Sequence, residues 1–204
     1  MSANPSDIEF LFDAADRFHR AGNLQRASEL YERVRTLEPY HVMTLNNQAL
    51  IAKALGRLDL SLRMLEQARR REPANFEVLA NLGRVSLQNN QSEEAERYLK
   101  RALEIRAQDR NLALSLGKAL HDQGKNSEAK KILQVALRDN GECFELLLYL
   151  GMVVLGQIEE DECEDCSECD REARCYFRRA LKIEPEDDRV LEQLGYLEQL
   201  TRQL

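Results

Sequence analysis

The chain has 204 residues and a formal net charge of −7 at pH 7. Phosphate binding needs a clustered basic surface, so this charge argues against nucleic acid as the main ligand. No stretch approaches the roughly 18 consecutive apolar residues of a membrane-spanning helix, and the first residues, MSANPSDIEF, lack the basic and apolar regions of a secretory signal. These features predict a cytoplasmic protein without a membrane span.

From residue 8 onward, pairs of amphipathic helix patterns recur with a period of 34 residues. A small residue early in each second helix marks the period at Ala27, Ser61, Ala95 and Ala129. A glycine late in the first helix marks it again at Gly83, Gly117 and Gly151. Because a glycine inside a helix costs about 1 kcal/mol relative to alanine, these glycines predict that two helices approach closely there.

The period divides most of the chain into four units after a polar lead-in at residues 1–7. We predict these units at residues 8–41, 42–75, 76–109 and 110–143. Asn75 is placed to cap the first helix of the third unit. The fourth unit ends in Gly141 instead of proline, and a glycine directly after a helix supplies a left-handed C-cap.

The fifth unit, residues 144–187, departs from the period. Gly151 and Gly195 occupy equivalent places but lie 44 residues apart, so about ten residues have been added to the 34. We place this acidic, cysteine-rich insertion at about residues 158–170, in the turn between the two helices. Residues 188–204 begin a further helix, which we interpret as the cap that a repeat array needs. Its apolar stripe packs on the fifth unit or mediates self-association, and consists of Leu197, Leu200 and Leu204.

This 34-residue pattern resembles the tetratricopeptide repeat (TPR) family over nearly the whole chain. In the second unit the matching residues are Leu45, Ala49, Gly56, Ser61, Leu65, Ala68 and Pro73. The resemblance implies an all-α, right-handed α-solenoid of about five helix-turn-helix units with a C-terminal capping helix. It also implies an adaptor, scaffold or chaperone-like module that binds a peptide or helix of another protein in a concave groove.

In proteins of this family the first helices of successive repeats line the groove. Transferred to this sequence, the groove residues are Phe12, Asp16, His19, Met43, Asn46, Asn47, Leu50, Asn81, Arg84, Lys118, His121, Tyr149 and Met152. Asn47 and Asn81 occupy equivalent places. A carboxamide both donates and accepts hydrogen bonds, so it can pair with a peptide backbone whatever the peptide's side chains. We expect both asparagines to be exposed enough to be replaced without loss of the fold.

Four cysteines lie in and just after the insertion, in a C-x2-C-x2-C-x5-C pattern: Cys163, Cys166, Cys169 and Cys175. Four thiolates could close a tetrahedral zinc site. An iron–sulfur cluster fits less well, because such runs end in C-x3-C-P. Acidic neighbours disfavour the thiolate form of cysteine, so they oppose both a zinc site and an iron–sulfur cluster. The alternatives to a metal site are an acidic loop with no cofactor and a loop with redox-active thiols.

The sequence does not predict catalysis. Its three histidines, His19, His41 and His121, fall in different units, so a nucleophile and a base are not expected to meet. We therefore predict that the chain is not an enzyme. Two alternatives to a partner-binding module remain open: a metal- or redox-responsive regulator acting through the cysteine segment, and a scaffold that forms homo-oligomers through the C-terminal helix.

Overall fold

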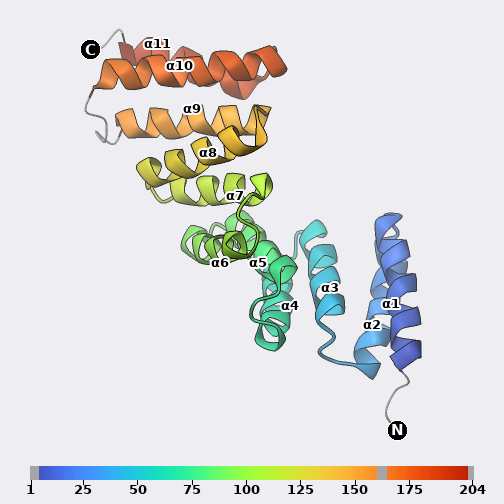
Figure 1. Cartoon of the computed structure of the whole chain (residues 1–204). Coiled ribbons are helices and arrows are strands. Elements are labelled where there is room, and N and C mark those ends of the chain that lie inside the picture. The colour runs from blue at the N-terminus through green and yellow to red at the C-terminus, as the bar shows by residue number, and fades with distance from the viewer. Residues whose placement is uncertain (1–4, 160–164, 202–204) are drawn as a thin grey trace. The chain divides into compact units, whose positions relative to one another are not determined.

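The computed structural model describes residues 5–159 and 165–201, and every regular element within those ranges is an α-helix (Figure 1). This confirms the predicted all-α class. The helices of the described ranges are α1 (Pro5–Arg20), α2 (Leu24–Leu37), α3 (Val42–Ala54), α4 (Leu58–Arg71), α5 (Phe76–Gln88), α6 (Ser92–Ile105), α7 (Arg110–His121), α8 (Asn126–Asn140), α9 (Phe144–Glu159), α10 (Cys166–Ile183) and α11 (Asp188–Thr201).

The helices belong to two compact units. Unit 1 is residues 1–91 with α1 to α5, and unit 2 is residues 92–204 with α6 to α11. Within unit 1, α1 packs on α2 and α3 packs on α4. Within unit 2, α7 packs on α8 and α9 packs on α10 (Figure 1). The two helices of each of these pairs are therefore neighbours in space, as helix-turn-helix units require.

Polar side chains determine where several helices begin. The Asn75 side chain accepts a hydrogen bond from the Val78 amide at 3.1 Å and caps α5, which confirms the predicted cap. Helix α1 differs from the prediction, because it begins at Pro5 and includes residues assigned to the lead-in. Proline is favourable at the first helical position, where its missing N–H would have no partner in the helix.

The core consists mainly of leucine and alanine. In unit 1, Leu11, Ala15, Ala27, Tyr31 and Val34 belong to one buried cluster. In unit 2, fully buried side chains include Leu99, Leu116, Leu120, Leu133 and Phe177. Small residues on the second helices let the paired helices approach closely, which explains the period of Ala27, Ser61, Ala95 and Ala129.

The glycines of the first helices do not all have the same surroundings. A Cβ on Gly117 would lie 2.6 Å from Leu133, and a Cβ on Gly151 would overlap the ring of Phe177. These two positions confirm the predicted close approach. Gly195, the equivalent residue of α11, differs from these two, because a Cβ there would meet nothing within 4 Å. After α8, Gly141 has a φ of +79° and a ψ of −179°, a backbone conformation that essentially only glycine adopts. Glycine is therefore required at this helix end, but it is extended and not the left-handed helical cap that the sequence predicts.

The insertion lengthens helices instead of forming only a turn. Helices α9 and α10 have 16 and 18 residues, whereas α5 and α6 have 13 and 14. Cys166 already begins α10, so the expectation of a loop over residues 158–170 is wrong at both ends. Asp165 makes this start favourable, because its carboxylate accepts from the amides of Ser167 at 2.8 Å and Glu168 at 3.3 Å.

Helix α9 is apolar on nearly all sides because it is packed between other helices. Its neighbours within unit 2 are α7, α8, α10 and α11. A helix that is hydrophobic all round must be buried in this way. Among the described residues no helix, α9 included, combines the length and apolar character needed to cross a membrane.

The C-terminal helix uses part of its apolar stripe for packing. Leu197 is 1% exposed, so it packs inside unit 2 and is not available to a second molecule. Leu200 is half-buried, and Leu204 lies outside the described residues. The exposed large apolar residues of α11 are instead Leu191 and Tyr196.

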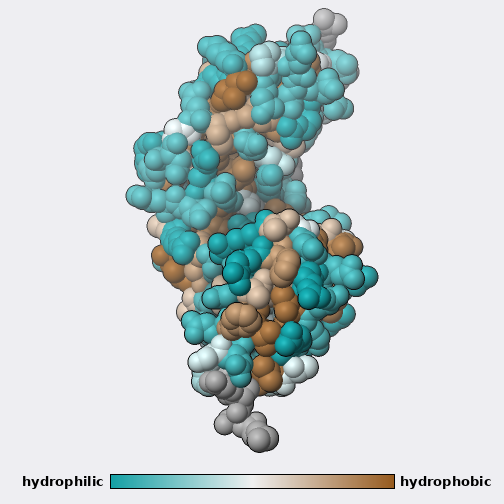
Figure 2. All heavy atoms as spheres, turned by 90° about the vertical axis from the view of Figure 1, so that its right-hand side faces the viewer, coloured by the Kyte–Doolittle hydropathy of each residue, from teal (hydrophilic) through white to brown (hydrophobic). Residues whose placement is uncertain are grey.

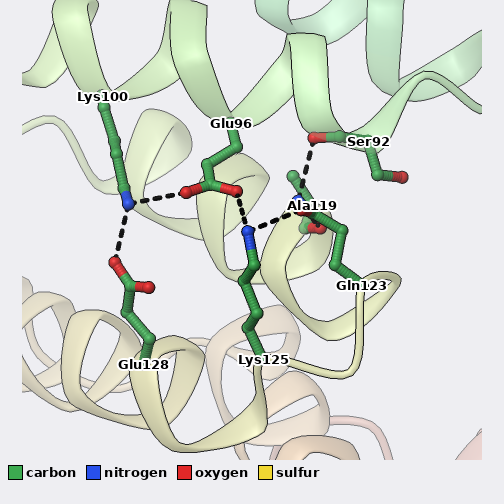
Figure 3. Close-up of polar contacts among 7 residues, drawn as sticks. All are labelled: Ser92, Glu96, Lys100, Ala119, Gln123, Lys125 and Glu128. Atoms are coloured by element: carbon green, nitrogen blue, oxygen red, sulfur yellow. Dashed lines mark hydrogen bonds and ion pairs between the residues drawn. The ribbon is translucent and has the colours of Figure 1, made fainter.

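A network of charged side chains ties α6 to the end of α7 and the start of α8 (Figure 3). Glu96 accepts from Lys100 at 2.7 Å and from Lys125 at 2.8 Å, and Lys100 also contacts Glu128 at 2.7 Å. Gln123 donates to the backbone oxygens of Ser92 and Ala119. Burial raises the pKa of Glu96, but the hydrogen bonds from Lys100, Lys125 and Gln123 outweigh it and lower that pKa to about 2.

Replacing Glu96 by glutamine should lower the free energy of unfolding by about 1–2 kcal/mol at neutral pH, because two lysines lose their shared carboxylate. The carboxylate's contribution is present above its unfolded pKa of 4.5 and is lost as the pH falls toward 2. Urea unfolding at about pH 7 and about pH 3 should therefore show a smaller difference between wild type and variant in acid. Glu104→Gln, exposed on the same helix, is the control, and an equal loss in both variants contradicts the prediction.

Candidate functional site

The predicted groove residues fall into two groups, one in each unit. Nine lie on α1, α3 and α5 of unit 1, and we name this surface the unit 1 face: Phe12, Asp16, His19, Met43, Asn46, Asn47, Leu50, Asn81 and Arg84. The other four lie on α7 and α9 of unit 2: Lys118, His121, Tyr149 and Met152. Each group is built by its own unit.

Aromatic rings form one end of the unit 1 face. The ring of Phe12 lies 5.1 Å from that of His41 and 5.9 Å from that of Tyr31. The ring of His19 meets Tyr31 edge-on at 6.2 Å. His41 is fixed by its position as the N-cap of α3, where Nδ1 accepts from the Thr44 amide at 3.3 Å. The contact of Phe12 with His41 links α1 to the start of α3, and the contacts with Tyr31 link α1 to α2.

A chain of side-chain hydrogen bonds forms the floor of the unit 1 face. Arg84 donates to Asn81 at 2.7 Å, and Asn81 donates to Asn46 at 2.8 Å. Asn46 donates to Asn47 at 3.1 Å, and Asn47 donates to the Tyr31 hydroxyl at 2.9 Å. Each carboxamide thus uses one N–H and its oxygen within the protein. One N–H of each asparagine has no partner among the described residues.

The asparagines are more buried than the sequence led us to expect. Asn46, Asn47 and Asn81 are 3%, 8% and 4% exposed. The expectation that Asn47 and Asn81 are exposed is therefore wrong, and replacing either would leave its partners in a buried site without a hydrogen bond. Asn46 has a larger part than predicted, since it joins the carboxamides of α3 and α5.

Tyr31 ends this chain of hydrogen bonds in the core. It is 0% exposed and its hydroxyl accepts from Asn47. Burial, opposed by that hydrogen bond, raises the pKa of Tyr31 to about 12. The phenol therefore stays neutral at all physiological pH values and acts as a fixed hydrogen-bonding partner.

An apolar pocket of about 340 Å³ opens between α1 and the start of α3. Its walls are Pro5, Ile8, Glu9, Phe12, Glu38, His41 and Met43. Phe12 is half-buried and Met43 is 37% exposed, so the pocket is accessible and can take an apolar side chain. Two predicted groove residues, Phe12 and Met43, thus line a real cavity.

Two cations lie at the other end of the unit 1 face. Lys53 is in the last turn of α3, and Arg84 is on the neighbouring helix α5. Neither has a carboxylate within ion-pair distance among the described residues. Burial and the nearby Arg84 guanidinium lower the pKa of Lys53. The pair therefore presents positive charge without an internal counter-ion.

The predicted residues of unit 2 make fewer mutual contacts. The Lys118 ammonium lies 4.3 Å from the centre of the Tyr149 ring, a cation–π contact between α7 and α9. His121 Nδ1 lies 2.7 Å from Asn126 Oδ1 at the start of α8, so this histidine supports the turn. Met152 is half-buried on α9. The pocket of about 300 Å³ in unit 2 is lined by other residues, among them Ala113, Ile132 and Val135.

Figure 2 shows a band of apolar surface on the side of unit 1 that α1 and α2 present to the viewer, with hydrophilic residues on both sides. The exposed large apolar residues of these helices are Phe10 at 68%, Phe18 at 38% and Leu37 at 41%. Single exposed apolar residues are ordinary, but a continuous band indicates a surface that can be covered.

Helix α10 separates the predicted metal ligands. Cys166 and Cys175 are nine residues apart, or about 13 Å along a helix, whereas two sulfurs on one zinc ion are at most about 4.6 Å apart. Cys166 and Cys169 are half-buried one turn apart, and Cys163 lies outside the described residues. Within residues 5–159 and 165–201, no three His, Cys, Asp or Glu side chains are grouped to hold a metal ion.

Sequence reasoning missed three contributors to the unit 1 face: Tyr31, His41 and Lys53. Tyr31 is a core residue of α2, so only the structure shows its hydroxyl at the floor. His41 precedes α3, and it contributes to the unit 1 face because its side chain caps that helix. Lys53 could have been found, because it follows Leu50 by three residues and so shares a helix face with it.

Comparisons with known proteins agree with this architecture. A family model described as tetratricopeptide repeat matches residues 52–113 and 93–150. Sequence comparison with curated proteins finds no match. Among solved structures, MamA from Desulfovibrio magneticus RS-1 is similar with a TM-score of 0.77 and 17% identity, over 91% of this chain and 99% of that one.

Two further structures have the same fold. YrrB, described as a TPR protein with an unusual peptide-binding site, has a TM-score of 0.76 and 19% identity, over 89% of each chain. PilF of Pseudomonas aeruginosa has a TM-score of 0.75 and 19% identity, over 95% of this chain and 83% of that one. The family match over residues 52–150, together with the period and the helix-turn-helix units, shows that the chain contains tetratricopeptide repeats.

Proposed function

We propose that this chain is a non-catalytic interaction module, an adaptor, scaffold or chaperone-like protein, that binds a segment of a partner protein on the unit 1 face. The observation that carries the proposal is the open apolar pocket between Phe12 and Met43, next to the floor of hydrogen-bonded asparagines. An apolar pocket with a few fixed polar groups beside it is the usual form of a recognition site. The peptide-binding site named for YrrB, which has the same fold, is consistent with the proposal.

The floor of the unit 1 face is suited to a ligand in a defined position. Its carboxamides are held by each other, so they lose little conformational freedom when a ligand binds. The remaining N–H groups of Asn47 and Asn81 can donate to backbone oxygens of an extended segment. Side-chain selectivity then depends on the pocket and on the charged residues around the floor.

Met43→Glu should reduce capture of the partner at least about tenfold. An apolar side chain entering the pocket would remove water from the new carboxylate without replacing its hydrogen bonds, which is unfavourable. Met43 is 37% exposed in the first turn of α3, where a negative charge is favourable, so the fold should be unaffected. Proteins bound from a cell lysate would be quantified by mass spectrometry for wild type and variant. Leu191→Glu, 47% exposed near the start of α11 in unit 2, is the matched control, because it makes a similar change near another helix N-terminus.

A specific protein lost from Met43→Glu and kept by Leu191→Glu supports binding on the unit 1 face. Equal capture by all three proteins contradicts it. The experiment also distinguishes partner binding from self-assembly, because a self-assembling scaffold would capture mainly further copies of this chain. A metal- or redox-responsive regulator would instead show capture that changes with added zinc or with thiol oxidation, a dependence that Cys166→Ser would remove.

A further inference from the structure

The unit 1 face differs chemically from one end to the other. At the start of α3, the pocket offers the apolar surfaces of Ile8, Phe12 and Met43. In the middle lie Asn46 and Asn47, whose carboxamides are buried and hydrogen-bonded. At the end of α3 the surface becomes positive. A ligand that satisfies all three regions must therefore be apolar at one end and negative at the other.

The positive end is built to receive a carboxylate. Arg84 uses one N–H to donate to Asn81 at 2.7 Å, and Asn81 is held in turn by Asn46 at 2.8 Å. The guanidinium is thus oriented by buried groups, and most of its five donors have no partner in the part of the chain that the structure describes. Lys53, on the same side, has no carboxylate partner among the described residues. Two unneutralised cations side by side repel each other, and an anion from outside would relieve that repulsion.

The distance between the two ends defines the spacing on the ligand. Met43 and Lys53 are ten residues apart on α3, which corresponds to about 15 Å at 1.5 Å per residue. An extended chain covers about 3.3 Å per residue, so this distance equals four or five residues. Met43, Asn47, Leu50 and Lys53 follow one another at helical spacing, so an extended segment can lie along them.

We propose that the unit 1 face selects an extended segment of a partner protein in which an apolar side chain precedes or follows an acidic side chain by four or five residues. The apolar side chain occupies the pocket at Phe12 and Met43, and the carboxylate binds Lys53 and Arg84. This inference rests on the proposed function and adds the sequence pattern of the partner. It commits to an Asp or Glu side chain and not to the partner's terminal carboxylate.

The test is selection of a random dodecapeptide display library on the full chain, followed by binding of the selected peptides in synthetic form with amidated C-termini. The enriched peptides should carry Leu, Met or Phe four or five positions from Asp or Glu. Changing that acid to its amide should weaken binding about tenfold, and Lys53→Glu should do the same. Arg63→Glu, exposed on α4 with the same change of charge, should bind as wild type does.

Charge exchange makes the assignment specific. A peptide with lysine in place of the acid should bind Lys53→Glu better than it binds wild type. Selected peptides without the spaced acid, or equal losses in Lys53→Glu and Arg63→Glu, overturn the inference. If selected peptides without the spaced acid bind Met43→Glu more weakly than wild type, the proposed function stands, but the proposed spacing of the apolar and acidic side chains is wrong. If no peptide is selected, or Met43→Glu binds normally, the proposed function fails as well.

Discussion

Replacing Gly151 by alanine should lower the free energy of unfolding by about 2–3 kcal/mol, whereas Gly195→Ala should leave it unchanged or raise it by up to about 1 kcal/mol. The two glycines occupy equivalent places in successive repeats. A Cβ at position 151 would overlap the ring of Phe177, which is 0% exposed and cannot move without disturbing the core. At position 195 the added methyl meets nothing within 4 Å.

Urea unfolding followed by far-ultraviolet circular dichroism measures both effects. Gly195→Ala is the matched control, because it makes the same chemical change inside a helix of the same unit. In an open position alanine favours the helix through its smaller loss of backbone entropy. Equal destabilisation by the two substitutions would contradict the packing of α9 on α10 described here.

Replacing Asn46 by alanine should cost about 2–3 kcal/mol of stability, more than an exposed asparagine would. The substitution leaves the Asn81 amide and the Asn47 oxygen without their partner in a buried site. Asn111→Ala, exposed in the first turn of α7, should change stability by less than about 0.5 kcal/mol. The measurement is again denaturant unfolding.

A double-mutant cycle isolates the bond between α3 and α5. Asn46→Ala, Asn81→Ala and the double variant should show a coupling of about 1 kcal/mol, because the second substitution removes a group that has already lost its partner. Additive losses would mean that the two carboxamides do not interact in solution. The same variants explain why the asparagines are poor probes of binding: they change the fold together with the surface.

The helices were predictable because their cause is local. The 34-residue period places small and apolar residues on one side of each helix, and a helix that buries such a side has a defined length and partner. Two residues at equivalent places in the 34-residue period need not have the same packing, however. Gly151 and Gly195 are alike in the sequence, but only Gly151 has a neighbouring second helix that brings a Phe177 ring against it.

The candidate site was predictable in position but not in burial. The family resemblance placed Asn46, Asn47 and Asn81 on one surface, and the structure puts them together. Their burial depends on contacts between residues 35 apart in the sequence, which spacing within one helix does not show. The extent of the insertion was missed for a similar reason, since Asp165 starts α10 early by capping it.

The four methionines offer the most direct test of binding on the unit 1 face: Met1, Met43, Met64 and Met152. With their methyl groups labelled with carbon-13, each gives a separate signal in an NMR spectrum. Met43 lies at the pocket, Met64 on α4 away from the unit 1 face, and Met152 in unit 2. Titration with a selected amidated peptide should shift the Met43 signal and leave Met64 and Met152 in place. A shift of Met64 or Met152 with Met43 unchanged would place the binding surface elsewhere and contradict the proposed function.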